Sequence, residues 1–269
     1  MNHGYSLLST TSIGPSPVQI ETAQELANLL QIPYVSRGDS SLSALCSAHG
    51  VSGALVVSAG RVSCIAGGRE FFFHPGLAML RIKELKNGKI DKMIEAMALR
   101  ERYKVLDCTL GLGSDAIVAS FVAGESGRVV GLEGSPVIAA IVARGLAGYR
   151  TGDGEIDLAM RRIEVIAADH QRFLEGLAPG SFDVIYFDPM FRQPRKHSPA
   201  INAMRCLAKA DPLKREAVET AVRIAAKRVV VKERRGSSEF DRLGIEEIYG
   251  GRYAPVVYGV IRGRGGVVR

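Results

Sequence analysis

Between residues 104 and 232, short apolar segments alternate with segments of helical periodicity, and this alternation restricts the possible folds more than any other feature of the sequence. The apolar segments have the length of strands, and helical segments connect them. The expected strands are 104–110, 127–132, 162–167, 182–187 and 228–232, and the expected helices are 116–123, 136–149, 170–177 and 212–226. This order predicts an α/β fold with a mostly parallel, doubly wound sheet that helices cover on both faces. One more strand is expected at 256–262.

The residues before this alternation predict a small, separate α/β domain. Apolar residues recur at helical spacing over 19–30, and two strands, 53–57 and 61–66, flank a short turn. Two further helices are expected before the alternating region, at 76–86 and 89–100. We therefore expect a small N-terminal α/β domain of residues 1–75, followed by a ligand-binding domain of residues 76–269.

Acidic residues stand at the ends of four of the expected strands: Asp107, Glu133, Asp169 and Asp188. A single acid at such a position is often a helix cap or a turn residue. The carboxyl ends of parallel strands, however, meet at one edge of the sheet, and ligands of open α/β sheets bind there. Four acids at this edge indicate a ligand site.

Two glycines after the first of these strands suggest which ligand it is. Gly111 and Gly113 would let the backbone approach a ligand and would expose amides at a helix start. A dinucleotide site of the GxGxxG type needs a third glycine, but residue 116 is Ala, and Asp107 precedes the loop. Carboxylates suit a ligand with ribose, adenine and a positively charged end. These features favour S-adenosylmethionine, with S-adenosylhomocysteine as its product, over a nicotinamide dinucleotide.

The ordered motifs resemble those of class I methyltransferases and are similar, more narrowly, to the YhiQ-like family. That family contains the small-subunit ribosomal RNA guanine-N2 methyltransferase. The resemblance covers about residues 103–232. The segments that carry it are Asp107-x-Thr109-x-Gly111-x-Gly113, Gly111–Ala116, Leu132–Val137 with Arg144–Ala147, Asp188–Phe191 and Arg228–Lys232.

The resemblance implies a Rossmann-like class I methyltransferase fold and a set of cofactor contacts. Glu133 would bind the ribose hydroxyls and Asp169 the adenine amino group. The family commonly has a basic residue at the positions of Ser114 and Gly134, and a Pro at that of Arg192, so the departures concern the substrate more than the cofactor. The expected cofactor-binding residues are Asp107, Gly111, Gly113, Ser114, Asp115, Glu133, Gly134, Asp169, His170 and Asp188.

The segment Asp188-Pro189-Met190-Phe191 indicates the reaction. An exocyclic base amine is a poor nucleophile because its lone pair is delocalised into the ring. A carboxylate and a backbone carbonyl at the strand end can accept its two hydrogens, Pro189 stiffens the turn, and Phe191 would stack on an extruded base. We therefore predict Asp188, Pro189 and Phe191 as catalytic residues. The alternative is that Asp-Pro only begins a turn and Phe191 packs inside.

The charge distribution favours a nucleic-acid substrate. Residues 1–188 contain 17 Lys and Arg against 20 Asp and Glu, whereas residues 189–269 contain 18 against 8. Either a polyanionic partner or a solvated basic surface explains this excess. The resemblance and the position of the cations favour contacts to RNA phosphates. The expected RNA-binding residues are Arg192, Arg195, Lys196 and Lys232.

Other features exclude several classes of protein. No apolar run approaches the ~20 residues that a membrane span requires, and the first residues lack the basic and apolar parts of a secretion signal. The four cysteines are scattered without a CxxC pair, so no metal is expected. We expect a cytoplasmic protein with no membrane span, and the oligomeric state stays open.

The function that these observations predict is S-adenosylmethionine-dependent methylation of the exocyclic N2 amine of a guanine in small-subunit ribosomal RNA. One alternative keeps the cofactor and changes the acceptor to DNA adenine, a protein side chain or a small molecule. Another is a non-catalytic RNA-binding factor that retains the fold.

Overall fold

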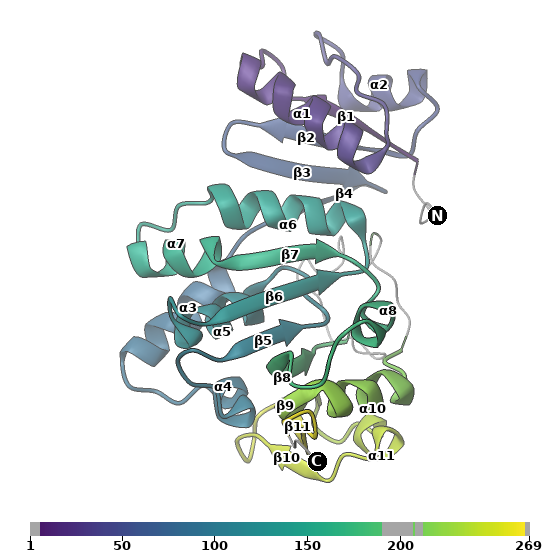
Figure 1. Ribbon diagram of the computed structural model, residues 1–269. Coiled ribbons are helices and arrows are strands. Elements are labelled where there is room, and N and C mark those ends of the chain that lie inside the picture. Colours follow the sequence, from purple (N-terminus) through teal and green to yellow (C-terminus); the bar gives the residue numbers. More distant parts are fainter. Residues whose placement is uncertain (1–5, 190–206, 208–211, 267–269) are drawn as a thin grey trace. The chain divides into compact units, whose positions relative to one another are not determined.

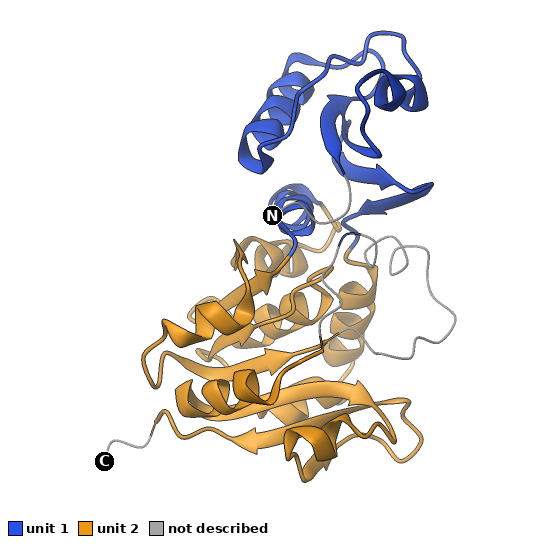
Figure 2. Ribbon diagram, turned by 90° about the vertical axis from the view of Figure 1, so that its right-hand side faces the viewer, with its two compact units in different colours: residues 1–74, 135–149, 195–210 blue, residues 75–134, 150–194, 211–269 orange. Residues whose placement is uncertain are grey.

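The computed structural model describes residues 6–189, 207 and 212–266, and these divide into two compact units (Figures 1 and 2). The first unit contains residues 6–74 and 135–149, together with Leu207. The second contains residues 75–134, 150–189 and 212–266. No helix in these described ranges is long and apolar enough to cross a bilayer.

The second unit is built around a sheet in which the described strands have the order β10-β11-β9-β8-β5-β6-β7. Their bounds are β5 Lys104–Asp107, β6 Arg128–Glu133, β7 Ile163–Ala167, β8 Phe182–Phe187, β9 Ala225–Arg234, β10 Glu247–Tyr249 and β11 Val256–Arg262. The neighbours from β7 to β9 are parallel, and β11 is antiparallel to both β9 and β10. The predicted mostly parallel α/β sheet is confirmed.

The strand order reverses beside β5. After β5 the chain adds β6 and β7 on one side, and it then returns to add β8 and β9 on the other. Loops that leave neighbouring strands in opposite directions open a crevice at their carboxyl ends, where ligands of such sheets bind. The ends of β5 and β8 therefore mark the expected ligand site.

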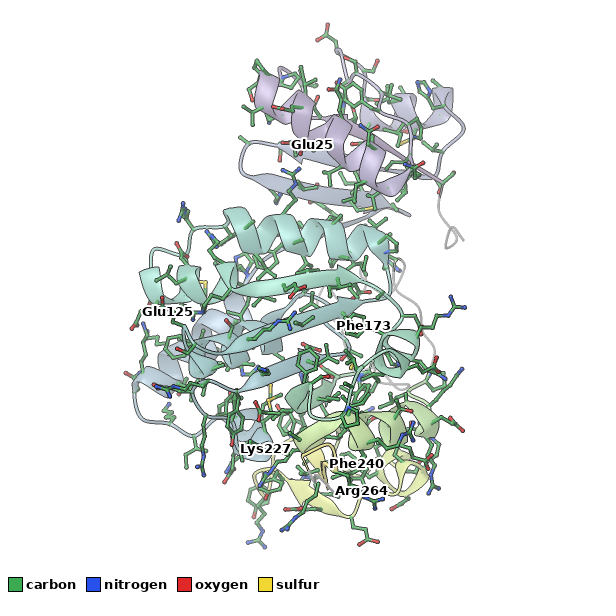
Figure 3. The ribbon with its side chains drawn as sticks, in the orientation of Figure 1. Glu25, Glu125, Phe173, Lys227, Phe240 and Arg264 are labelled. Atoms are coloured by element: carbon green, nitrogen blue, oxygen red, sulfur yellow. The ribbon has the colours of Figure 1, made fainter. Side chains whose placement is uncertain are left out.

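Helices cover both faces of this sheet. One core contains residues of α8, α10 and α11, and Figure 3 shows Phe173 of α8 and Phe240 of α11 on this side. On the other face, α5 contacts β5, β6 and β7, and α3 packs against α5. The helices of this unit are α3 Gly76–Lys86, α4 Lys92–Met97, α5 Ser114–Ala123, α7 Gly154–Arg161, α8 His170–Glu175, α10 Arg215–Ile224 and α11 Glu239–Leu243.

Strand alternation decides which side chains meet near the crevice. Leu106 and Phe187 belong to the core under α8 and α10. Because successive side chains of a strand point to opposite faces, Asp107 and Tyr186 point toward α5. These two residues are also register partners across β5 and β8. Polar side chains from distant parts of the sequence are thus gathered on one face.

The first unit has a four-stranded sheet of order β1-β2-β3-β4 in the part of the chain that is described. The β1–β2 pair is parallel and the other two pairs are antiparallel. The bounds in this unit are β1 Leu7–Thr11, α1 Pro17–Leu30, α2 Leu42–Ala48, β2 Gly53–Ser58, β3 Arg61–Ala66, β4 Arg69–Phe72 and α6 Pro136–Gly148. The predicted helix 19–30 and strands 53–57 and 61–66 are present, whereas β1, α2 and β4 were not predicted.

Helix α1 begins where the sequence provides a capping box. The Ser16 hydroxyl accepts a hydrogen bond from the Gln19 backbone amide, and the Gln19 side chain accepts one from the Ser16 amide. Pro17 occupies the first helical position, where the missing N–H costs nothing. The helix ends at Gln31 in the left-handed conformation.

Helix α6 follows β6 in the sequence and packs within the first unit. Its Ala140 joins Ala23, Leu26 and Val57 in one apolar cluster. The predicted domain boundary after residue 75 stays a prediction. The first compact unit also contains residues 135–149, which were expected in the second domain. The sequence predicted this helix at 136–149, but a helical pattern does not identify the partner of the helix.

Candidate active site

The loop between β5 and α5 stays bonded to both neighbours of β5. The Cys108 amide donates to the Tyr186 carbonyl at 2.9 Å, and the Leu110 amide donates to the Leu132 carbonyl at 2.9 Å. Gly111 and Gly113 then adopt φ values of 52° and 74°, the left-handed region that favours glycine. Gly113 caps α5, so the free amides of this helix start lie at the predicted crevice.

Glu133, at the end of β6, lies against this glycine loop. Its Oε2 accepts a hydrogen bond from the Gly111 amide at 3.1 Å. The next residue, Gly134, is exposed, and no atom lies within 4 Å of the position that a Cβ would take. The strand end therefore combines a carboxylate with open space beside it, as the predicted ribose contact requires.

Asp169 and His170 lie at the end of the next strand. Asp169 caps α8, because its Oδ1 accepts a hydrogen bond from the Arg172 amide at 3.2 Å. The His170 ring packs edge-on against Phe187, with centroids 5.8 Å apart, and so lies beside the end of β8. Burial lowers the pKa of His170, which favours the neutral ring. The predicted contacts of both residues with the cofactor stay predictions.

Asp115, on the first turn of α5, is the centre of a charged network. The Tyr186 hydroxyl donates to its Oδ2 at 2.7 Å, and Lys232 Nζ lies 2.9 Å from the same oxygen. Arg81 on α3 pairs with its Oδ1 and also with Asp91, at 2.7 and 3.0 Å. Burial opposes ionisation, but Lys232 and Arg81 hold the pKa of Asp115 well below its usual range.

The network reaches solvent at Asp188. Lys232 Nζ lies 2.7 Å from Asp188 Oδ2, so its ammonium joins two carboxylates. The exposed fraction of the side chain rises from 9% at Asp115 to 17% at Lys232 and 29% at Asp188. Burial raises the pKa of Asp188 above its ordinary value, and Lys232 opposes this shift. Asp188 is thus the member of this trio that a substrate can reach most easily.

A second set of hydrogen bonds fixes the backbone of Asp188. Its amide donates to Thr109 Oγ1 at 2.6 Å, and the Thr109 amide donates to Asp107 Oδ1 at 3.0 Å. Asp107 is almost fully buried, and burial raises its pKa to about 8. The first acid of the predicted set therefore positions the last one through Thr109.

The structure brings most of the predicted residues to one edge of the sheet. Phe191, Arg192, Arg195 and Lys196 lie outside the described residues, so their roles stay predictions. Lys232 was predicted to contact RNA, and its amine lies between two carboxylates; that contact also stays a prediction. No group of His, Cys, Asp or Glu in the described part of the chain could hold a metal ion.

Sequence reasoning missed four residues of the network: Arg81, Asp91, Thr109 and Tyr186. Tyr186 could have been found, because it lies two residues before Asp188 in a strand and therefore shares its face. Thr109 had been noted only as part of a motif. Arg81 carries no local signal, since the packing of α3 on α5 brings it to Asp115.

Comparisons with known proteins agree with this geometry. Residues 72–243 match the family described as "Putative SAM-dependent methyltransferase", where SAM is S-adenosylmethionine. The chain belongs to this methyltransferase family. The "Uncharacterized protein YpiP" of Bacillus subtilis is 39% identical to the methyltransferase over 254 residues, which cover 94% of this chain and 98% of that protein.

Another relative of the methyltransferase has a name that states a substrate. The "Ribosomal RNA small subunit methyltransferase J" of Cronobacter sakazakii is 33% identical over 228 residues, 76% of this chain and 87% of that protein. A SAM-dependent methyltransferase from Neisseria gonorrhoeae has a solved structure with a TM-score of 0.62 and 20% identity, covering 96% of this chain and 97% of its own. This likeness confirms the Rossmann-like class I fold. The cofactor of the methyltransferase is S-adenosylmethionine.

Proposed function

We propose that the protein transfers a methyl group from S-adenosylmethionine to the exocyclic N2 amine of a guanine in small-subunit ribosomal RNA. The observation that carries this proposal is the Asp188 carboxylate, partly exposed at the end of β8 and directly followed by Pro189. The name of the Cronobacter sakazakii relative supports ribosomal RNA as the substrate. A ribosomal RNA substrate would place the reaction in the cytoplasm.

The residues at the crevice fit the cofactor. Gly111 and Gly113 adopt left-handed φ values and bring no side chain of their own to the start of α5, and Gly134 leaves room beside Glu133. Burial destabilises the ionised form of Asp107. A positively charged ligand group nearby would favour the ionised carboxylate and would be attracted to it. When bound, the cofactor supplies an electrophilic methyl group on a positively charged sulfonium.

The protein's own contribution would be to orient and polarise the amine. An ionised Asp188 accepts one N–H of the base, which favours a pyramidal nitrogen with its lone pair available. Lys232 keeps this carboxylate ionised, and Thr109 fixes its backbone at 2.6 Å. Pro189 has a fixed φ and restricts the backbone of the preceding residue, Asp188. Correct placement of the two reactants supplies much of the remaining rate gain.

The acceptor can be identified by labelling. Purified protein, labelled S-adenosylmethionine and total RNA from a strain that lacks the gene should give labelled N2-methylguanosine in small-subunit ribosomal RNA. Parallel reactions replace the RNA with DNA or with protein from the same strain. Label in either of these, or in another nucleoside of the RNA, would replace the proposed acceptor. Absence of label from all three would contradict a macromolecular substrate.

The role of Asp188 can be tested with a matched pair of variants on β8. Asp188→Asn should lower the turnover number by at least about 100-fold, because an amide does not provide an anionic acceptor. Asp183→Asn, at the opposite end of the same strand, should keep most of the activity. Turnover and circular dichroism are measured for both. A folded Asp188→Asn protein with normal turnover would remove Asp188 from the mechanism.

A further inference from the structure

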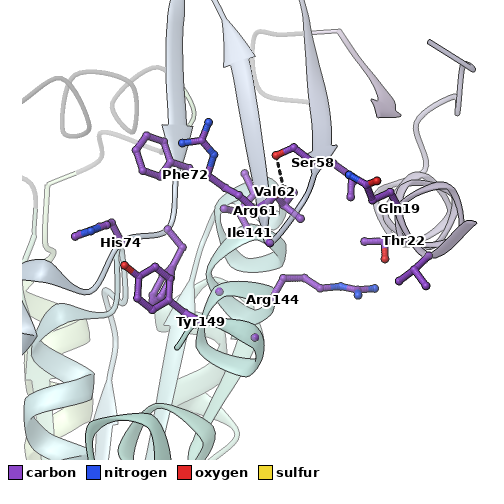
Figure 4. A pocket seen from close by; sticks show the side chains of 16 residues that line it. Gln19, Thr22, Ser58, Arg61, Val62, Phe72, His74, Ile141, Arg144 and Tyr149 are labelled. Atoms are coloured by element: carbon purple, nitrogen blue, oxygen red, sulfur yellow. Dashed lines mark hydrogen bonds between the residues drawn. The ribbon is translucent and has the colours of Figure 1, made fainter. Parts of the chain in front are cut away.

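The first unit contains a cavity of about 430 Å³, separate from the crevice with Asp188. Its lining comes from α1, from the strands β2 to β4 and the residues that follow them, and from α6 (Figure 4). Every lining residue belongs to the first unit. The methyl-transfer mechanism uses none of them, so the cavity needs an explanation of its own.

The charged residues in the lining are cationic. Arg61 and Arg144 line the cavity, and no Asp or Glu is among its lining residues. Each guanidinium pairs with one glutamate from outside the lining, Arg61 with Glu70 at 3.0 Å and Arg144 with Glu25. The arginine side chains are 47% and 41% exposed. Exposed ion pairs are weak, so an incoming phosphate can exchange with either carboxylate at small cost.

Aromatic rings line the cavity beside these cations. Arg61 lies over the ring of Phe72, with its Cζ 4.5 Å from the centroid. Tyr149 meets His74 edge-on at 5.7 Å, and Figure 4 shows the two rings next to each other. Apolar residues such as Ile141 complete the lining. Aromatic faces and arginines together are the chemistry with which proteins bind unpaired nucleotides.

Two glycines of α6 line the cavity, and one of them leaves open space. A Cβ at Gly145 would lie 2.1 to 2.4 Å from atoms of Phe73, so this glycine is required for packing. Gly148 also lines the cavity, but a Cβ there would meet no atom within 4 Å. A helix favours Ala over Gly, so this space is not explained by the stability of the helix.

We propose that this cavity binds one unpaired nucleotide of the RNA substrate, a nucleotide other than the methylated guanosine. The base packs against the ring of Phe72 or Tyr149, and its phosphate pairs with Arg61 or Arg144. The identity of the polymer as RNA rests on the proposed function. The proposal gives the N-terminal unit a role in substrate binding, although the basic excess of the sequence lies in residues 189–269.

A steric variant tests the site without a change of charge. Gly148→Leu places a side chain in the open space, and Gly154→Leu on α7 is the control, because a Cβ there also meets no atom within 4 Å. The dissociation constant of a short fluorescent single-stranded RNA is measured, with that of S-adenosylmethionine as a second readout. Gly148→Leu should weaken RNA binding roughly five- to hundred-fold, the range expected when a base loses its stacking. Cofactor binding and the control should stay unchanged.

A charge variant tests the phosphate contact. Arg144→Gln should weaken RNA binding and flatten its dependence on salt by about 0.7 in the log–log slope, the value for one phosphate of a single strand. Arg128→Gln is the matched control, because Arg128 is also partly exposed and pairs with one glutamate. Its slope should equal that of the wild type.

The outcomes separate this proposal from the proposed function. RNA binding that is unchanged in Gly148→Leu, or absent from the wild type, overturns the cavity as an RNA site. Guanosine monophosphate that binds the wild type but not Gly148→Leu, while RNA binding is equal in both, would assign the cavity to a free nucleotide and also overturn it. RNA binding that depends on Gly148, in a protein that does not methylate RNA, would support the cavity and contradict only the proposed function.

Discussion

The ammonium group of Lys232 forms ion pairs with two carboxylates. The carboxylate oxygens of Asp115 and Asp188 lie 2.9 and 2.7 Å from its Nζ. Burial alone would lower the pKa of Lys232, but the two acids raise it above its ordinary value. The lysine therefore stays protonated at every pH at which the enzyme would work, and we infer that it positions and ionises Asp188.

Replacing Lys232 should change the pH profile of the reaction. Without the charge of Lys232, the pKa of Asp188 rises. As the pH is lowered, Lys232→Met should therefore lose activity at a higher pH than the wild type does. The acidic limb of kcat/KM should move upward by roughly 1–3 pH units. Lys232→Arg should restore most of the profile, and Lys227→Met, on the same strand, is the control. An unshifted limb would contradict this role.

Asp107 makes the stability of the protein depend on pH. Burial raises its pKa to about 8, so the folded state holds a proton that the unfolded state releases near pH 4. The contribution to stability is complete below about pH 4 and is lost as the pH rises toward 8, by at most about 1.4 kcal/mol per pH unit. Asp107→Asn should flatten this dependence. Urea unfolding of both proteins across this range measures it, and parallel curves would contradict the buried, protonated state.

At the scale of elements, the sequence predicted those strands and helices whose apolar residues follow a clear pattern. The strands at 182–187 and 256–262 have the predicted bounds, because continuous apolar runs are typical of buried strands. Helix α7 was missed, since its eight residues are too few for a clear helical periodicity. Helix 89–100 was predicted too long, as α4 spans only Lys92–Met97. Which elements pack against each face of a helix or strand depends on tertiary packing, and a local sequence pattern does not predict it.

Helix α6 provides a test of element packing within one helix. Gly145→Ala should destabilise the protein by about 1–2 kcal/mol, because the clash with Phe73 outweighs the gain in helix propensity. Gly148→Ala should be neutral or stabilising by up to about 1 kcal/mol, since its Cβ meets no atom. Thermal unfolding of the two variants compares them directly. Equal midpoints of thermal unfolding in the two variants would show that the Phe73 side chain moves aside without cost.

At the scale of the whole molecule, the basic excess of residues 189–269 would attract a negatively charged substrate. The four strand-end acids could be predicted as a group because parallel strands share one carboxyl edge. The network through Arg81 could not, because it joins residues 34 positions apart across two helices. Arg192, Arg195 and Lys196 lie outside the described residues. Their effect on RNA binding can still be measured.

Replacing Arg195 and Lys196 together with Gln should weaken RNA binding and flatten its salt dependence. Two lost phosphate contacts on a single strand correspond to a change of about 1.4 in the log–log slope. The control is the double replacement of Lys83 and Lys89, which are exposed and lie in the part of the chain without basic excess. Equal slopes in both double variants would assign Arg195 and Lys196 to a solvated surface.

The position of α6 in the sequence has a consequence during synthesis. The N-terminal sheet emerges from the ribosome first, but the helix that completes its apolar cluster follows only after β6. The nascent N-terminal segment must therefore wait, partly uncovered, until about 75 further residues have been translated. Transiently exposed apolar surface is what chaperones bind, and a circular permutant that places α6 beside β4 should shorten that exposure.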